Sequence, residues 1–186
     1  MYVESHIDIS IDSAKYEQML NNITFKAPLE IGVEVAVYMV LFGLLENTDM
    51  VVMDIDTMHK KQAKVYSNNK NEVSGAVPDL VIVDKTFSYT NPSPDSSAYA
   101  LIEIKNLKEP DIKENNNEII SHKKNTNNFI WTNGKIWHYS NKLKPKKNWD
   151  IDLCSKETTD DSISVDSFKY AELLYRLKNI DWKSDN

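Results

Sequence analysis

The sequence predicts an α/β fold in which a mixed central β-sheet, made of a meander and a hairpin, is flanked by helices. Two apolar runs, 77–83 and 99–104, have the length and nearly continuous hydrophobicity of buried strands. A third observation is Asn133-Gly134, which separates two aromatic-rich runs and is a strong hairpin signal. A type I′ turn needs positive φ at both central positions, and Asn and Gly adopt it readily.

Composition is that of an ordinary globular protein. The 186 residues are 41% hydrophobic and 27% charged, which is enough for one domain with a proper core. We expect a single domain over 1–186, with the core of the fold at about 28–140 and a C-terminal helix at 165–180 packing on it. The single cysteine, Cys154, excludes an internal disulfide and fits a reducing compartment.

The sequence gives no sign of membrane insertion. The N-terminus is acidic, whereas a signal peptide has a basic stretch before an apolar one. The most apolar stretch, 29–45, is short for a bilayer span and contains Glu30 and Glu34. We therefore predict a cytoplasmic protein with no membrane partner.

The charge limits how the chain could recognise nucleic acid. The net charge is −6, and Arg176 is the only arginine among 22 basic residues. Binding a polyanion therefore requires a local basic patch or a metal ion. Without arginines for bidentate contacts to bases, sequence-specific recognition is not favoured.

The first part of the chain predicts an extended segment and two helices. Alternating isoleucines over 7–11 predict a short strand or arm, and 13–22 predicts a surface helix capped by Asp12 or Ser13. A longer helix is expected over 28–46, with Pro28 in its first turn. Since this helix is apolar nearly all round, we expect it to be central and buried.

The later elements follow the same patterns. Strands at 50–55, 77–83 and 99–104, with a short one at 64–66, form an antiparallel meander. A helix over 110–124 is weakened by three consecutive asparagines. After the hairpin, we expect a basic connector at 141–149, an acidic loop at 155–161 and an amphipathic helix at 165–180.

Charged side chains mark the ends of the two buried strands. Glu103 and Lys105 are two positions apart in a strand, so they share one face, while Ile104 points to the other. Asp79 stands near the start of the preceding strand. A Pro-Asp pair is often turn chemistry and a Glu-x-Lys pair is often a solvated edge. Buried charges are costly unless they are paired, however, so we predict a metal site.

The order of these motifs resembles a known family. A long helix carrying a glutamate precedes PD at 78–79 and E-x-K at 103–105, and a helix and a strand follow. This order is similar to the PD-(D/E)xK nuclease superfamily. The segment 129–140 resembles the segment after the core helix in the N-terminal nuclease domain of type I restriction motor subunits. The resemblance covers about 28–140 and implies a restriction-endonuclease-like core.

The resemblance also implies roles for the charged residues. Asp79, Glu103 and the carbonyl of Ile104 would bind Mg²⁺, with Mn²⁺ as a substitute, because hard cations prefer oxygen ligands. Lys105 would orient the attacking water and stabilise the hydroxide. Glu34 resembles the helical glutamate that reaches the metal, with Glu30 as its alternative. The competing interpretation places both glutamates at the exposed first turn of the helix, stabilised by its dipole.

Other candidate contacts are weaker. Type I-like members usually carry a glutamine on the helix after E-x-K, and this sequence has Ser121, His122 and Lys124 there instead. His122 is either a phosphate or water ligand or a solvent-facing helix residue. Candidate phosphate contacts are His122, Lys124, Lys144, Lys146 and Lys147, although a solvated connector explains the last three equally well. The hairpin aromatics either stack on bases or form core: Trp131, Trp137 and Tyr139.

The sequence therefore predicts a Mg²⁺-dependent endonuclease or exonuclease that hydrolyses phosphodiester bonds of DNA with little sequence specificity. RNA is not excluded as a substrate, and a homodimer is left open because double-strand cleavage needs two sites. The alternative is a catalytically inactive nuclease-fold protein that acts as a nucleic-acid- or protein-binding module, such as an inhibitor or adaptor. An acidic surface suits that role because it can occupy a basic partner's groove.

Overall fold

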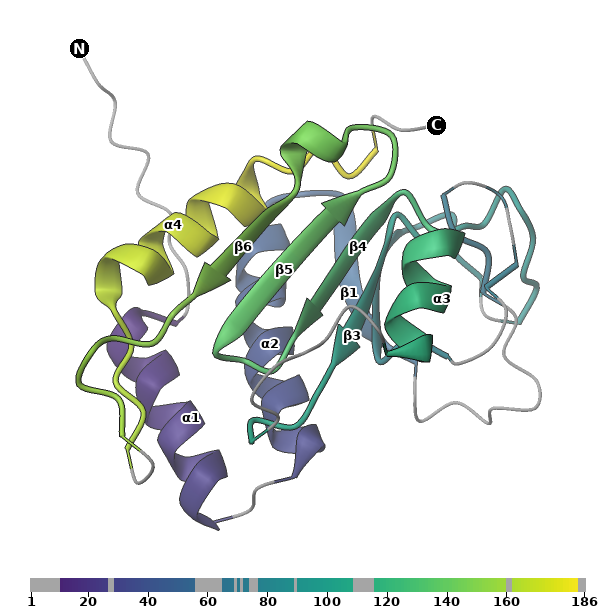
Figure 1. The fold of residues 1–186 in the computed structure, drawn as a ribbon. Coiled ribbons are helices and arrows are strands. Elements are labelled where there is room, and N and C mark those ends of the chain that lie inside the picture. The colour runs from purple at the N-terminus through teal and green to yellow at the C-terminus, as the bar shows by residue number, and fades with distance from the viewer. Residues whose placement is uncertain are drawn as a thin grey trace.

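One sheet of six strands organises the molecule, and the strand order in the sheet follows the chain (Figure 1). The strands are β1 (Met50–Asp54), β2 (Leu80–Asp84), β3 (Ala100–Ile104), β4 (Asn128–Thr132), β5 (Ile136–Asn141) and β6 (Trp149–Asp152). The computed structural model describes residues 11–26, 29–55, 65–68, 70, 72–73, 77–88, 90–108, 116–159 and 162–183. Neighbouring strands are antiparallel except β3 and β4, which are parallel, so the sheet is mixed.

Helices cover both faces of this sheet. They are α1 (Ser13–Lys26), α2 (Glu30–Leu45), α3 (Asn117–Asn125) and α4 (Ser167–Lys178), with a short 3-10 turn, η1 (Pro145–Lys147). The first, second and fourth helices pack on one face, and α3, which connects the parallel pair β3 and β4, lies on the other (Figure 1). The predicted α/β fold with a mixed, helix-flanked sheet is confirmed.

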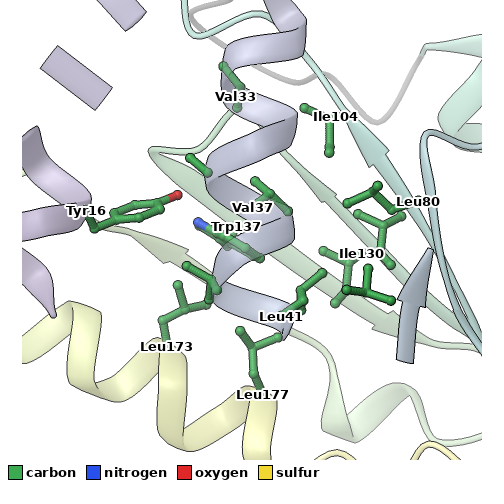
Figure 2. Packing of buried hydrophobic residues seen from close by; sticks show 14 of the residues in the cluster. Tyr16, Val33, Val37, Leu41, Leu80, Ile104, Ile130, Trp137, Leu173 and Leu177 are labelled. Atoms are coloured by element: carbon green, nitrogen blue, oxygen red, sulfur yellow. The ribbon is translucent and has the colours of Figure 1, made fainter. Parts of the chain in front are cut away.

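Strand alternation divides the apolar side chains between two cores. In β2, Leu80 and Ile82 face α2, whereas Val81 and Val83 face α3. All four are buried, which explains why this strand is apolar without interruption. In the larger core, Val37 and Leu41 of α2 lie between the sheet and the α4 leucines (Figure 2).

The meander and the hairpin are present as predicted, but the turn between β4 and β5 is of another type. Gly134 has a φ of 84°, and among the described residues Lys70 is the only non-glycine with positive φ. Asn133 therefore does not adopt the conformation that a type I′ turn requires. Instead, its side-chain oxygen accepts hydrogen bonds from the backbone N–H of Lys135 at 3.0 Å and of Ile136 at 2.9 Å.

Three helix predictions and one connector need correction. The long helix α2 is not buried all round, since Ile31, Val35 and Phe42 are 52%, 50% and 52% exposed. The predicted helix over 110–124 does not include Asn116, whose backbone is extended and whose side chain caps α3 by accepting from the N–H of Glu118. On the last helix, Phe168 of the predicted apolar face is 86% exposed. The predicted basic connector 141–149 contains η1, and β6 begins at its end.

Several predictions fall on residues outside the described ranges. These are the arm over 7–10, Pro28, Lys64 at the start of the predicted short strand, and 110–115 of the predicted helix. Asp12 caps α1 as predicted, because its carboxylate accepts from the backbone N–H of Lys15 at 2.7 Å. No helix in the described part of the chain is both long and apolar enough to cross a bilayer.

Candidate active site

Asp79 is held against the end of β3. It immediately precedes β2, and its Oδ2 accepts a hydrogen bond from the backbone N–H of Ile104 at 2.5 Å. That contact places the carboxylate beside the peptide that joins Glu103 to Ile104. The two acidic positions of the predicted motif, Asp79 and Glu103, are therefore brought together.

Glu103 and Lys105 point to the same side, as their spacing predicts. Lys105 Nζ donates to Glu103 Oε1 at 2.5 Å, and the two residues are only 8% and 3% exposed, respectively. The Lys105 N–H donates to the carbonyl of Thr132 at 2.9 Å, which anchors the chain to β4 beyond the last residue of β3. The charged pair is thus fixed by backbone pairing on a buried part of the sheet.

Glu118 is a second carboxylate that contacts Lys105, and it was not among the site residues predicted from the sequence. Its Oε2 accepts a second hydrogen bond from Lys105 Nζ at 2.9 Å. Burial lowers the pKa of Lys105, but the hydrogen bonds to Glu103 and Glu118 outweigh burial and hold it above its ordinary value. The hydrogen bond from Lys105 in turn lowers the pKa of Glu118. Lys105 therefore remains a cation and suits stabilisation of negative charge.

His122 does not face solvent, so that interpretation is wrong. It is one turn after Glu118 on α3, is fully buried, and packs its ring against Phe129 with centroids 5.9 Å apart. Its Nε2 lies 3.2 Å from Glu103 Oε2. The four-residue spacing of Glu118 and His122 was the available signal, since it places both side chains on one face of a helix.

The site carries more negative than positive charge. The pKa of Asp79 is raised to about 8, first by burial and then by the charges of Glu103 and Glu30, against the opposing effects of the Ile104 N–H and Lys105. A divalent cation would reverse this balance, because it favours the ionised carboxylate.

The donor set at this position fits Mg²⁺. The described residues contain no group of three or more His, Cys, Asp or Glu side chains arranged around one ion position. Mg²⁺ is commonly held by only one or two carboxylates, with water and substrate phosphate as its other ligands. Asp79, Glu103 and the Ile104 carbonyl meet that requirement.

The two glutamates of α2 lie in different environments. Glu34 is buried, at 8% exposure, so the interpretation that both stand exposed in the first turn fails for it. It lines a hollow of about 460 Å³ together with Tyr38 of the same helix and Asp54 of β1. Glu30 is exposed, yet its charge acts on Asp79. Asp54 pairs with Leu80, so this hollow adjoins the start of β2 next to Asp79.

The predicted lysine contacts lie away from the carboxylates. Strand register pairs Ile104 with Thr132 at the site and Asn128 with Asn141 at the opposite end of β4. The side chain of Lys142 donates to the carbonyl of Lys124 at that opposite end, and η1 follows shortly afterwards. The structure therefore separates one group of predicted phosphate contacts from the acidic cluster: Lys124, Lys144, Lys146 and Lys147.

A second hollow adjoins this lysine-rich end. It has a volume of about 200 Å³ and lies between the strands β5 and β6 and the helix α4. Its walls include Lys147, Trp149, Tyr175 and Arg176. The hairpin aromatics Trp131, Trp137 and Tyr139 are 2%, 0% and 4% exposed, so they belong to the core and not to a base-stacking surface.

Comparisons with known proteins support the fold. No protein-family model and no curated protein matches the sequence. A solved structure described as the cryoEM structure of a DrdV–DNA complex is similar, with a TM-score of 0.54 and 13% identity. The match covers 91% of this chain and 14% of that one, so this chain spans a small part of the similar protein's length. At this identity the similarity is one of fold, in agreement with a restriction-endonuclease-like core.

Proposed function

We propose that this protein is a metal-dependent nuclease that hydrolyses phosphodiester bonds of DNA with little sequence preference. The observation that carries the proposal is the convergence of Asp79, Glu103 and Lys105 at the ends of two paired strands. The DNA complex formed by the structurally similar protein supports the same substrate class. RNA is a second substrate to be tested.

Each residue has a chemical role in this proposal. Asp79, Glu103 and the Ile104 carbonyl would hold Mg²⁺ or Mn²⁺, and the ion would lower the pKa of a bound water and polarise the phosphate. Lys105 orients the attacking water and stabilises the hydroxide as a permanent cation. Glu34 contributes a further carboxylate from α2, through water where direct contact is not made.

A purely structural ion pair explains less of the site. It accounts for Glu103 and Lys105, whose charges compensate one another at 2.5 Å. It leaves Asp79 unexplained, because burial and two neighbouring carboxylates oppose the ionisation of this residue. Binding of a metal ion would explain why Asp79 is buried next to other carboxylates.

The test is a digest of linear, circular and single-stranded DNA and of RNA, with Mg²⁺ or Mn²⁺. Cleavage that needs the divalent ion and is lost in Lys105→Ala and Asp79→Asn supports the proposal. The exposed variants Lys156→Ala and Asp95→Asn serve as matched controls. Cleavage that persists in both site variants would assign the activity to a contaminant and overturn the proposal.

A role in protein contact is the second candidate, favoured by an exposed apolar stripe along α2. The stripe consists of Leu29, Ile31, Val35, Met39 and Phe42, each between 38% and 59% exposed. Exposed apolar patches of this kind mark interaction surfaces. An inactive binding module predicts no divalent-ion binding in calorimetry, whereas a homodimeric nuclease predicts both ion binding and self-association in sedimentation.

A further inference from the structure

Buried polar atoms of two side chains beside the proposed metal position lack hydrogen-bond partners. They are Glu103 Oε2 and both ring nitrogens of His122, and none of them makes a hydrogen bond with any described residue. The two side chains are 4% and 0% exposed, so bulk water does not satisfy them. Buried polar atoms in native proteins nearly always have a partner, and an ion is one explanation for such atoms.

Their geometry is that of two ligands of one ion. Glu103 Oε2 and His122 Nε2 are 3.2 Å apart, close enough for a hydrogen bond, but the contact does not have the geometry of one. An ion bound at about 2.1 Å to both atoms would subtend an angle of about 100° between them, near the values for tetrahedral and octahedral centres. In that arrangement the nitrogen lone pair points to the ion and away from the oxygen, which explains the missing hydrogen bond.

The surrounding charge also favours an ion at this position. Glu103, Asp79 and Glu118 bring three carboxyl groups to the site, and Lys105 supplies one positive charge among these contacts. The other oxygen of Glu103 is already engaged by Lys105 at 2.5 Å. Oε2 is therefore the oxygen of Glu103 that remains available to a metal.

We propose that His122 is a nitrogen ligand of the same ion that Glu103 binds, and that the centre therefore prefers transition-metal ions to Mg²⁺. The inference rests on the proposed nuclease function and names its metal. Imidazole suits Zn²⁺, Co²⁺ and related ions, whereas Mg²⁺ favours an all-oxygen shell. We expect Co²⁺ and Zn²⁺ to bind most tightly, followed by Mn²⁺ and then Mg²⁺. Because oxygen-only sites follow a similar order, the imidazole is identified by the selective loss of Co²⁺ affinity when His122 is replaced.

Pulsed electron paramagnetic resonance on the Mn²⁺-loaded full chain tests the ligand directly, without reference to activity. A bound imidazole gives a nitrogen modulation, which changes when the histidines carry ¹⁵N. The triple variant His6→Gln/His59→Gln/His138→Gln leaves His122 as the only histidine and is the matched control. We expect the modulation to persist in the triple variant and to disappear in His122→Gln.

Calorimetry supplies the second measurement. We expect His122→Gln to lose Co²⁺ affinity by at least roughly 10- to 100-fold, which is the loss already seen when a residue that only orients a metal ligand is removed, and to change Mg²⁺ affinity by less than about threefold. Should the buried substitution prevent folding, the ¹⁵N experiment on the triple variant still decides the matter.

The failures of the two proposals are distinguishable. Mn²⁺ binding without nitrogen modulation in the natural chain would overturn the role of His122, while Lys105-dependent cleavage would leave the nuclease intact. A chain that binds no divalent ion and cleaves no nucleic acid would overturn the nuclease function and, with it, this inference.

Discussion

Lys105 and Glu118 connect β3 to α3 through a hydrogen bond of 2.9 Å between the ammonium and the carboxylate Oε2. Lys105 also donates to Glu103, so its position is fixed from two sides. The two glutamates therefore have different roles. Glu103 is proposed to bind the metal ion, whereas Glu118 only positions Lys105.

Substitution Glu118→Gln should therefore slow cleavage modestly. The amide keeps the shape of the side chain and removes the charge that helps to raise the pKa of Lys105. We expect a loss of about three- to tenfold in single-turnover rate, because a displaced positioning contact costs far less than a lost reacting group. Divalent-ion affinity should stay the same. A loss of ion binding would instead make Glu118 a ligand.

Substitution Lys105→Ala should have a much larger effect. We expect the rate to fall by at least ~100-fold, which is typical for removal of an acid–base group. Ion affinity, measured by calorimetry, should not fall, because the site loses a positive charge. Lys156→Ala changes an exposed lysine away from the site and should retain full activity. A rate within threefold of the natural chain would remove Lys105 from the mechanism.

The pairing of Glu103 with Lys105 could be predicted from sequence because strand alternation is a local rule. The residues i and i+2 share a face whatever the rest of the fold does. The approach of Asp79 was predictable in outline, since two antiparallel neighbours bring the start of one strand to the end of the next. Its hydrogen bond to the Ile104 N–H could not be predicted from the sequence, because that contact depends on the register between β2 and β3.

The parts that depend on packing were not predictable in the same way. His122 was assigned alternatives because the period of α3 does not say which face meets the sheet, and Glu118 was overlooked for the same reason. The hydrophobicity of α2 predicted full burial, yet Val35 and Phe42 are exposed because no described element covers that stripe. The basic segment 141–149 predicted a connector, so the strand β6, which begins at Trp149, was not predicted.

The raised pKa of Asp79 predicts an unusual pH dependence of stability without metal. The ordinary pKa of an aspartate, 3.8, applies to the unfolded chain, whereas the pKa of Asp79 in the folded chain is about 8. Between these pH values the folded state therefore binds more protons than the unfolded state. Stability from this group is then lost as the pH rises through that window. We expect the melting temperature in EDTA to fall from pH 6 to pH 8.5, and to fall less in Asp79→Asn. Asp95→Asn, which changes an exposed carboxyl, should retain the slope of the natural chain.

Metal affinity should change in the opposite direction with pH. Asp79 must lose its proton before it binds a cation, so apparent Mg²⁺ affinity should rise by up to about tenfold per pH unit below pH 8 and level off above it. Calorimetry at a series of pH values measures this dependence. A flat profile would mean that Asp79 does not bind the ion.

The lysines of η1 should contribute to DNA binding but not to chemistry. Lys146 and Lys147 are exposed at the end of the sheet opposite the carboxylates. Each phosphate contact removed lowers the salt dependence of binding by about 0.9 in the slope of log K against log salt. The double variant Lys146→Ala/Lys147→Ala should therefore lose a slope of about 1.8, with an unchanged rate at saturating DNA. Lys85→Ala/Lys156→Ala is the control, and equal slopes in both would exclude η1 from the contact.

The apolar stripe on α2 predicts self-association. Val35 and Phe42 are 50% and 52% exposed, and β1 is an edge strand of the sheet, so two copies could meet around a two-fold axis through the same surface. The variant Val35→Ser/Phe42→Ser should shift sedimentation toward the monomer at concentrations where the natural chain dimerises. Its unfolding free energy should change little, because exposed substitutions usually have small effects. If both proteins remain monomeric at every concentration, the stripe does not bind a second copy, and the homodimer hypothesis has no support from this surface.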